Sequence, residues 1–353
     1  MQTYRVDEIE NKLILGRNGL NEQGLALFWS GSGIELNVKA RSLYVNIDCA
    51  YDDMELMMDI IIEGERTQKL VLDRGLKKYL VFNGMIPEKP VNVRIIRDTQ
   101  CMTEEKNHHM IIKSFETDGS FEPVEEYGYN IEFIGDSLTS GEGCGLTKRV
   151  EWIPVIFDAT ENYSYKTAKI LNAGYQVISE SGWGLYASWD ANLNNVLPDY
   201  YEKTCGTSKD SVSIAMGAHE EWDFAGPEMD AVIVNLGTND NGALKTGKFE
   251  REAFIEAFKD KGREFLKTIR KHNNSCMIVW AYGMLGNDME PYIKELIGSY
   301  KAESGDTRVE YLRLPECIGD DLGVRAHPTP AAHEKIARCL AEHLQSLQAF
   351  MLR

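Results

Sequence analysis

Short apolar or alternating runs, separated by turn formers, fill the first third of the chain. Each run is five or six residues long and rich in β-branched or aromatic side chains, which is the pattern of a half-buried strand. Seven runs follow it, at 25–29, 33–38, 42–47, 57–62, 78–82, 91–96 and 110–115. Seven such strands with turn signals between them predict an antiparallel β-sandwich.

The rest of the chain has a different pattern, because apolar strands there alternate with helical stretches. The expected strands cover 131–135, 176–179, 232–236, 277–282 and 309–312. The expected helices cover 163–171, 248–271, 290–302 and 330–347. This alternation predicts a three-layer α/β/α domain built on a parallel sheet.

The length of the chain indicates two domains, since 353 residues exceed what one hydrophobic core usually supports. The segment 116–126, Glu-Thr-Asp-Gly-Ser-Phe-Glu-Pro-Val-Glu-Glu, interrupts the strand pattern with turn formers and acids. We therefore expect a sandwich domain at 1–118, a linker at 119–128 and the α/β domain at 129–353.

Charge limits the partners that the protein can have. It carries 38 basic and 55 acidic residues, a formal net charge of −17, without a basic stripe. It should repel nucleic acid, and a neutral substrate suits it better. No apolar run approaches a membrane span in length, so no membrane partner is expected. His108, His109 and His219 lack paired ligand spacing, so neither a metal nor another cofactor is predicted. Nothing in the pattern indicates an oligomeric state.

Cysteine usage bears on the compartment. Seven cysteines are scattered at positions 49, 101, 144, 205, 276, 317 and 339. An odd, scattered set is typical of reduced thiols rather than of a disulfide framework. The N-terminal residues lack the charged-then-apolar pattern of a secretory leader. On the sequence as it stands, these features predict a cytoplasmic protein.

Candidate chemistry begins where the first strand of the α/β domain ends. The apolar run at 131–134 breaks at Gly-Asp and is followed by Ser137. In open α/β sheets, reactive groups gather beyond the carboxyl ends of the strands, so Ser137 is a candidate nucleophile. Taken alone, Gly-Asp-Ser-Leu is as typical of an ordinary turn with an N-cap serine.

Two later segments bring matching groups to the same edge of the sheet. Asn239 follows the strand at 232–236 in a Gly-Thr-Asn-Asp turn, and its amide suits an oxyanion that forms beside a serine. His327 lies in the loop before the last helix, for which Thr329 is the expected N-cap. Its ring can take the serine proton and return it to a leaving group. His333, about one turn into that helix, is interpreted as a helix-face residue.

Together with a glycine block between them, these segments resemble the SGNH hydrolase superfamily, also called the GDSL esterases. The glycine block is 177–186, Val-Ile-Ser-Glu-Ser-Gly-Trp-Gly-Leu-Tyr, with serine at 179 where asparagine is common. The resemblance spans about 129–345. It implies that Ser137 is the nucleophile and His327 the base.

The same resemblance implies an oxyanion hole. The N–H groups of Ser137 and Gly184 and the side-chain amide of Asn239 would form it, with Gly182 as the near alternative to Gly184.

One position departs from the superfamily pattern. An aspartate normally stands three residues before the histidine and orients its ring, but here that residue is Val324. Asp320 and Asp321 are the nearest acids, and a loop could return them to His327. The alternatives are a backbone carbonyl that accepts the second ring N–H, an acid from elsewhere, or an inactive site. We expect a Ser137–His327 dyad with a backbone carbonyl.

A closer resemblance is to carbohydrate esterase family two, which includes members that use such a dyad. The segment 28–35, Phe-Trp-Ser-Gly-Ser-Gly-Ile-Glu, looks like the early sandwich signature of that family, and Glu-Trp-Asp-Phe at 221–224 is similar to another of its phrases. The resemblance implies that the sandwich is a jelly roll. It also implies that the substrates are acetylated plant polysaccharides, such as xylan or mannan, and oligosaccharides derived from them.

The expected function is therefore that of a serine acetylesterase. The candidate substrate-binding residues are Asp136, Trp183 and Trp222. The two tryptophans are chosen because indoles suit the apolar faces of pyranose rings. Trp183 would crowd a long acyl chain, which favours acetyl. Two alternatives stay open: a general short-chain or lipase-like esterase, and a carbohydrate-binding protein with an inactive hydrolase fold.

Overall fold

The computed structural model describes residues 1–145 and 150–347. Its contacts divide the chain into two units. The first comprises Met1–Glu126 and Glu202–Trp222, and the second comprises Tyr127–Tyr201 and Asp223–Arg353. The segment 202–222, which the sequence prediction assigned to the α/β domain, thus groups with the N-terminal strands.

Alternation of inward and outward side chains builds the two sheets of the first unit. In β6 (Ser42–Tyr51) every second residue from Leu43 to Cys49 is buried, as the two-residue period of a strand requires. The other strands of the first sheet are β1 (Gln2–Arg5), β3 (Asn18–Asn21), β4 (Gly24–Leu27), β9 (Gly75–Asn83) and β11 (His108–Thr117). The second sheet contains β2 (Leu13–Leu15), β5 (Gly33–Lys39), β7 (Met57–Ile62), β8 (Glu65–Val71), β10 (Val91–Arg97) and β12 (Ser120–Glu122). Neighbouring strands pair antiparallel throughout.

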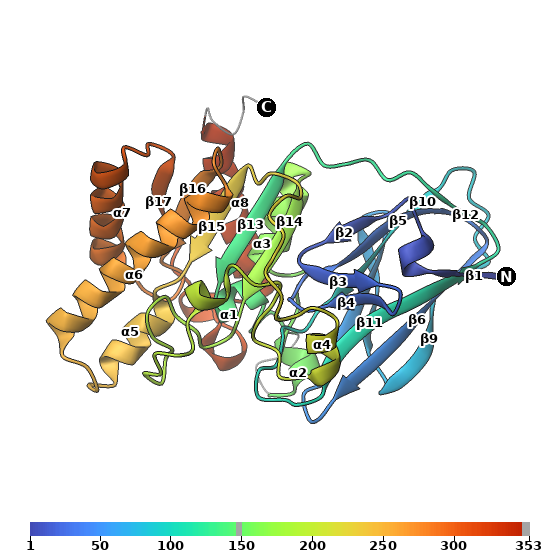
Figure 1. The fold of residues 1–353 in the computed structure, drawn as a ribbon, viewed down its shortest axis with the longest axis horizontal. Coiled ribbons are helices and arrows are strands. Elements are labelled where there is room, and N and C mark those ends of the chain that lie inside the picture. Colours follow the sequence, from blue (N-terminus) through green and yellow to red (C-terminus); the bar gives the residue numbers. More distant parts are fainter. Residues whose placement is uncertain (146–149, 348–353) are drawn as a thin grey trace. The chain divides into compact units, whose positions relative to one another are not determined.

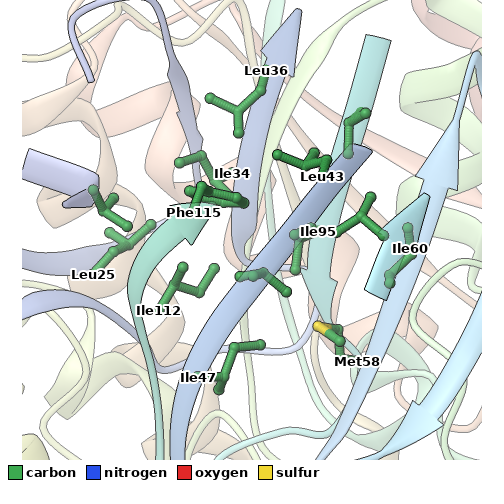
Figure 2. Packing of buried hydrophobic residues seen from close by; sticks show 14 of the residues in the cluster. Leu25, Ile34, Leu36, Leu43, Ile47, Met58, Ile60, Ile95, Ile112 and Phe115 are labelled. Atoms are coloured by element: carbon green, nitrogen blue, oxygen red, sulfur yellow. The ribbon is translucent and has the colours of Figure 1, made fainter. Parts of the chain in front are cut away.

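The strand order of this unit is that of a jelly roll. One sheet contains the order β4-β11-β6-β9 and the other β5-β10-β7-β8, which is the double Greek key of the jelly-roll architecture. Figure 2 shows the apolar side chains that pack between the strands, among them Leu25, Ile47 and Phe115 of the first sheet and Ile34 and Ile60 of the second. These five side chains are fully buried, and each contributes about 1.5–3 kcal/mol of transfer free energy. The predicted antiparallel sandwich is confirmed.

Five strands of the sandwich are not predicted by the sequence pattern. β1, β2, β3 and β12 have only three or four residues each, too few to establish a period. β8, Glu-Arg-Thr-Gln-Lys-Leu-Val, lies at the edge of the second sheet, where polar side chains face solvent. β12 falls within the expected linker at 119–128 and pairs with β5.

A five-stranded parallel sheet forms the second unit, as predicted. Its order is β14 (Gly174–Ser179), β13 (Asn130–Gly135), β15 (Ala231–Asn235), β16 (Met277–Tyr282) and β17 (Val309–Arg313). The chain moves from β13 to β14 on one side and then to β15 on the other. The carboxyl ends of β13 and β15 therefore flank the switch point, where open α/β sheets hold reactive groups.

Helices cover both faces of this sheet, so the three-layer prediction is confirmed (Figure 1). The long helices are α3 (Tyr163–Leu171), α6 (Arg251–His272), α7 (Glu290–Ser304) and α8 (Pro330–Ser346), each within three residues of its predicted bounds. α3 packs against α8, and α6 packs against α7. Right-handed crossovers that run in opposite directions along the sheet, from β13 to β14 and from β15 through β16 to β17, put α3 on one face and α6 and α7 on the other.

Shorter helices complete the chain. They are α1 (Ser137–Ser140), α2 (Ile153–Ile156), α4 (Ser211–Ala215) and α5 (Thr238–Lys245), with 3₁₀ turns at Val6–Glu8, Leu197–Tyr200, Gly319–Asp321 and Val324–Ala326. Among the helices within 1–145 and 150–347, none has the length and apolar character needed to cross a membrane.

Candidate active site

Ser137 lies at the tight turn that joins β13 to α1. The preceding residue, Asp136, is the N-cap of α1, and its carboxylate accepts a hydrogen bond from the Leu138 N–H at 3.0 Å. A Cβ at Gly135 would lie 2.1 Å from the Thr139 hydroxyl oxygen, so the turn has no room for a side chain there. The turn therefore holds the serine at the carboxyl edge of the sheet, as the sequence predicts.

His327 contacts this serine from the loop before α8. Its Nε2 lies 2.8 Å from Ser137 Oγ. The N-cap of α8 is Thr329, whose hydroxyl accepts from the Ala332 N–H, as predicted. Two residues 190 positions apart in sequence thus meet at the distance that proton transfer requires.

The second ring nitrogen of His327 is held by the backbone. Its Nδ1 lies 2.9 Å from the Arg325 carbonyl oxygen. Because a carbonyl can only accept, Nδ1 carries the proton, and Nε2 is left free to accept from the serine hydroxyl. The expectation of a carbonyl partner is confirmed. Asp321 instead accepts a hydrogen bond from Lys335, and Val324 is buried.

The expected oxyanion groups lie around the same turn. Within residues 1–145 and 150–347, no hydrogen bond uses the N–H of Ser137, whereas the Gly184 backbone forms an isolated parallel bridge with Val196. The Asn239 amide donates to Asp136 Oδ2 and to the Trp183 carbonyl, both at 2.9 Å. Since an oxyanion is a stronger acceptor than a carbonyl, it can compete with Trp183 for one amide proton.

The glycine block is shaped by Asp240, the residue after Asn239. Its carboxylate accepts the N–H groups of Leu185, Tyr186 and Ala187 at 2.7–3.0 Å. Burial nevertheless raises the pKa of Asp240 to about 6. A Cβ at Gly184 would lie 2.0 Å from the Ala187 carbonyl and 2.7 Å from this carboxylate. Only glycine fits at this position.

Asp136 is a structural group of the site rather than an exposed contact for substrate. Its side chain is fully buried and bonded to the Leu138 N–H and the Asn239 amide. Burial raises its pKa to about 7 against the opposing hydrogen bond from Leu138, and the charges of Asp240 and Glu142 add to the rise.

The tryptophans differ in how far their side chains are exposed. The indole of Trp183 is only 6% exposed and packs against Tyr200 at 5.1 Å, so it has little free face for a sugar. Trp222 belongs to the first unit, where the Arg17 guanidinium lies 5.4 Å from its ring. The side chain of Trp189, by contrast, is 63% exposed.

Trp189 is tied to the glycine block by its backbone. Its N–H donates to the Gly182 carbonyl at 3.0 Å, and a Cβ at Gly182 would lie 2.8 Å from its indole. Gly182, the alternative to Gly184 for the oxyanion hole, thus lies against an exposed tryptophan. His333, by contrast, is buried with its Nδ1 accepting from the Tyr163 N–H, a structural contact.

Comparison with known proteins identifies the family. Residues 131–340 match the family model described as GDSL-like Lipase/Acylhydrolase. The chain belongs to this family. A second model, described as Carbohydrate esterase 2 N-terminal, matches residues 14–124 of the GDSL protein, which contain the jelly roll. The GDSL protein is therefore a carboxylic ester hydrolase with the two-domain fold of family two carbohydrate esterases.

Several known proteins align with nearly the whole chain of the GDSL protein. The acetylxylan esterase / glucomannan deacetylase of Cellvibrio japonicus is 25% identical over 343 residues, which are 95% of this chain and 88% of that protein. A solved acetyl xylan esterase from the rumen bacterium Butyrivibrio proteoclasticus is 34% identical, with a TM-score of 0.93 and 98% of each chain covered. A family two carbohydrate esterase from Clostridium thermocellum, solved in complex with cellohexaose, shares the fold with a TM-score of 0.80 at 23% identity, covering 95% of this chain and 98% of that one.

Proposed function

We propose that this GDSL protein removes O-acetyl groups from acetylated oligosaccharides derived from xylan or glucomannan. The observation that carries the proposal is the 2.8 Å contact between His327 Nε2 and Ser137 Oγ, with the ring oriented by a carbonyl on its other side. The names of the relatives from Cellvibrio japonicus and Butyrivibrio proteoclasticus support the substrate class.

The reaction would proceed in two acyl transfers. His327 takes the proton of Ser137 while Oγ attacks the acetyl carbonyl, and the resulting oxyanion is held by the N–H groups of Ser137 and Gly184 and by the Asn239 amide. The tetrahedral intermediate then expels the sugar oxygen, which receives its proton from His327. Water, deprotonated by the same ring, attacks the acetyl-enzyme and releases acetate, and the serine recovers its proton.

Two features of the chain support a neutral sugar ester as substrate. The formal net charge of −17 disfavours polyanions. The exposed indole of Trp189 beside the glycine block offers an apolar face to a pyranose ring.

The test is acetate release from acetylated xylo- and manno-oligosaccharides, followed by NMR for wild type and Ser137→Ala. We expect release by wild type and a loss of about 10³-fold or more in the variant. Ser346→Ala, at an exposed serine near the end of α8, is the matched control.

Two outcomes would contradict the proposal. Turnover of aryl acetates that extends undiminished to long acyl chains, without release from the sugars, would indicate a general esterase. No turnover of either substrate would indicate a protein that only binds carbohydrate.

A further inference from the structure

The carbonyl that orients His327 belongs to a residue in an unusual conformation. Arg325 has φ 52° and ψ 30°, and Ala326 follows with φ 56°. Both lie in the left-handed region, which side chains other than glycine rarely adopt. A loop with two such residues keeps this conformation only where contacts from outside the loop stabilise it. The position of the Arg325 carbonyl therefore depends on such contacts.

The side chain of Arg325 provides one. Its guanidinium Nη1 lies 3.1 Å from Glu142 Oε1, while its Nε lies 3.4 Å from Glu151 Oε2. The Glu142 side chain is 7% exposed and the Glu151 side chain 67%. The ion pair with Glu142 is therefore partly desolvated and stronger, whereas a pair with an exposed glutamate contributes little.

Glu142 is itself joined to the nucleophile. Its backbone N–H donates to the Ser137 carbonyl at 3.0 Å, and it forms an antiparallel bridge with Phe157. The next residue, Gly143, lies so close to His327 that a Cβ there would be 2.2 Å from the histidine Cβ. The segment 142–143 thus contacts the serine turn on one side and the histidine loop on the other.

We propose that Glu142 is a positioning residue of the esterase and acts through Arg325. The ion pair holds the loop in its left-handed conformation, and the Arg325 carbonyl then holds the Nδ1 proton of His327. The carbonyl thus orients the histidine ring, which is the task of the aspartate in the superfamily pattern. Here Val324 stands at the position of that aspartate. It puts no carboxylate in contact with the ring, because Glu142 pairs with the guanidinium and the ring contacts the Arg325 carbonyl.

The inference rests on the proposed function only for its esterase chemistry, so an aryl acetate is a sufficient substrate. Arg325→Lys and Arg325→Met are a matched pair, since both keep a long side chain on the same backbone and only lysine keeps the charge. We expect Arg325→Met and Glu142→Gln each to lower kcat by about 10- to 100-fold with KM nearly unchanged, as for a misplaced catalytic group. Arg325→Lys should retain most of the activity, and Glu151→Gln should change kcat by less than about twofold.

Two readouts separate positioning from general support of the fold. In the double variant Glu142→Gln/Arg325→Met, kcat should fall no further than in either single variant, because the two residues act as one unit. The Nδ1 proton of His327 should give a downfield proton NMR signal in wild type that His327→Ala removes and that Glu142→Gln broadens or abolishes.

The proposal is overturned if both single variants keep the wild-type kcat, if their losses multiply in the double variant, or if the Nδ1 signal persists unchanged in Glu142→Gln. An inactive wild type would count against the proposed function instead, because the comparison among variants needs an active parent. Should Glu142→Gln unfold, the comparison of Arg325→Met with Arg325→Lys still decides the matter.

Discussion

Asp136 combines three tasks in one buried carboxylate: it caps α1, accepts from Asn239 and bears a charge that burial disfavours. Asn at this position keeps an oxygen for the cap but changes the acceptor that faces the Asn239 amide. We expect Asp136→Asn to lower kcat on an aryl acetate by about 10- to 100-fold, as loss of an oxyanion donor does. Asp260→Asn, at an exposed site on α6, is the control and should leave kcat unchanged.

The same substitution has a pH-dependent effect on stability. The pKa of Asp136 is about 7 in the folded protein and 3.8 ordinarily, so the folded state binds more protons between these values. Its contribution to the free energy of unfolding therefore falls as pH rises from about 4 to about 7, and stays low above that. Asp136→Asn should match wild type in Tm near pH 4 and exceed it at pH 8. A Tm difference that is constant with pH would contradict the raised pKa.

Trp189 provides a test of how sugars are held. Its indole is exposed beside Gly182, while that of Trp183 is buried. Trp189→Ala should raise KM for acetylated oligosaccharides by about 5- to 50-fold, which corresponds to about 1–2 kcal/mol and is comparable to the loss of a nucleic-acid base that stacks on an aromatic side chain. Hydrolysis of an aryl acetate should change by less than about threefold. Trp189→Phe, which keeps an aromatic face, should lie between; equal KM values for all three proteins would exclude the stacking role.

The loop that contains Gly143 is an element whose shape the active site depends on. Gly143 has φ +89°, and an added Cβ would lie 2.2 Å from that of His327. Gly143→Ala should displace the histidine and lower kcat by at least about 100-fold. Gly305, which ends α7 with φ +71° and open space around it, is the matched control. Gly305→Ala carries similar backbone strain, about 1 kcal/mol, and should lower only Tm.

Elements with a strong local pattern are the ones that the sequence predicts. α6 has an apolar stripe over most of its length and lies within three residues of its expected bounds, and Ser137, Asn239 and His327 follow from their places at strand and helix ends. α5, Thr-Asn-Asp-Asn-Gly-Ala-Leu-Lys, has no such stripe. Its Asn241 and Lys245 instead bond to Asp288, a contact that no local pattern reveals.

The parts of the site that could not be predicted depend on contacts between distant segments. Glu142 and Arg325 are 183 positions apart, and neither residue type signals a partner on its own. The burial of Trp183 depends likewise on Tyr200 from a separate turn. Spacing predicts which residues lie at the carboxyl edge of a sheet, but the orientation of each side chain is decided by tertiary packing.

The chain as a whole passes between its two units three times, at 126/127, 201/202 and 222/223. The segment 202–222 returns to the strands of the first unit and is bonded there by buried groups. The indole N–H of Trp29 donates to the Thr204 carbonyl at 2.9 Å, and the Asp210 carboxylate accepts from the His109 ring and from the His108 N–H. A cut after the jelly roll would leave this segment without its partners, so the two units are not independent modules in sequence.

Asp210 tests how much this return of the chain contributes to stability. Burial opposes its charge, but the hydrogen bonds from His109 and from the Ser213 N–H outweigh burial and hold the pKa of Asp210 below its ordinary value. A lowered carboxyl pKa stabilises the folded state above the ordinary value of 3.8, and this stabilisation is lost as pH falls through the lowered one.

Asp210→Asn retains an oxygen for the α4 cap and loses the charge, so it should lower Tm by a few degrees at pH 7, corresponding to about 1–2 kcal/mol. The difference should persist down to about pH 4 and shrink only below it, as pH falls through the lowered pKa of Asp210. At 25 °C kcat should not change, because Asp210 belongs to the unit without Ser137. Asp199→Asn, at a half-exposed site paired with Lys261, is the control for charge removal and should leave Tm within about a degree of wild type. Equal melting temperatures for wild type and Asp210→Asn across this pH range would mean that the buried bonds of the segment 202–222 do not limit the stability of the protein.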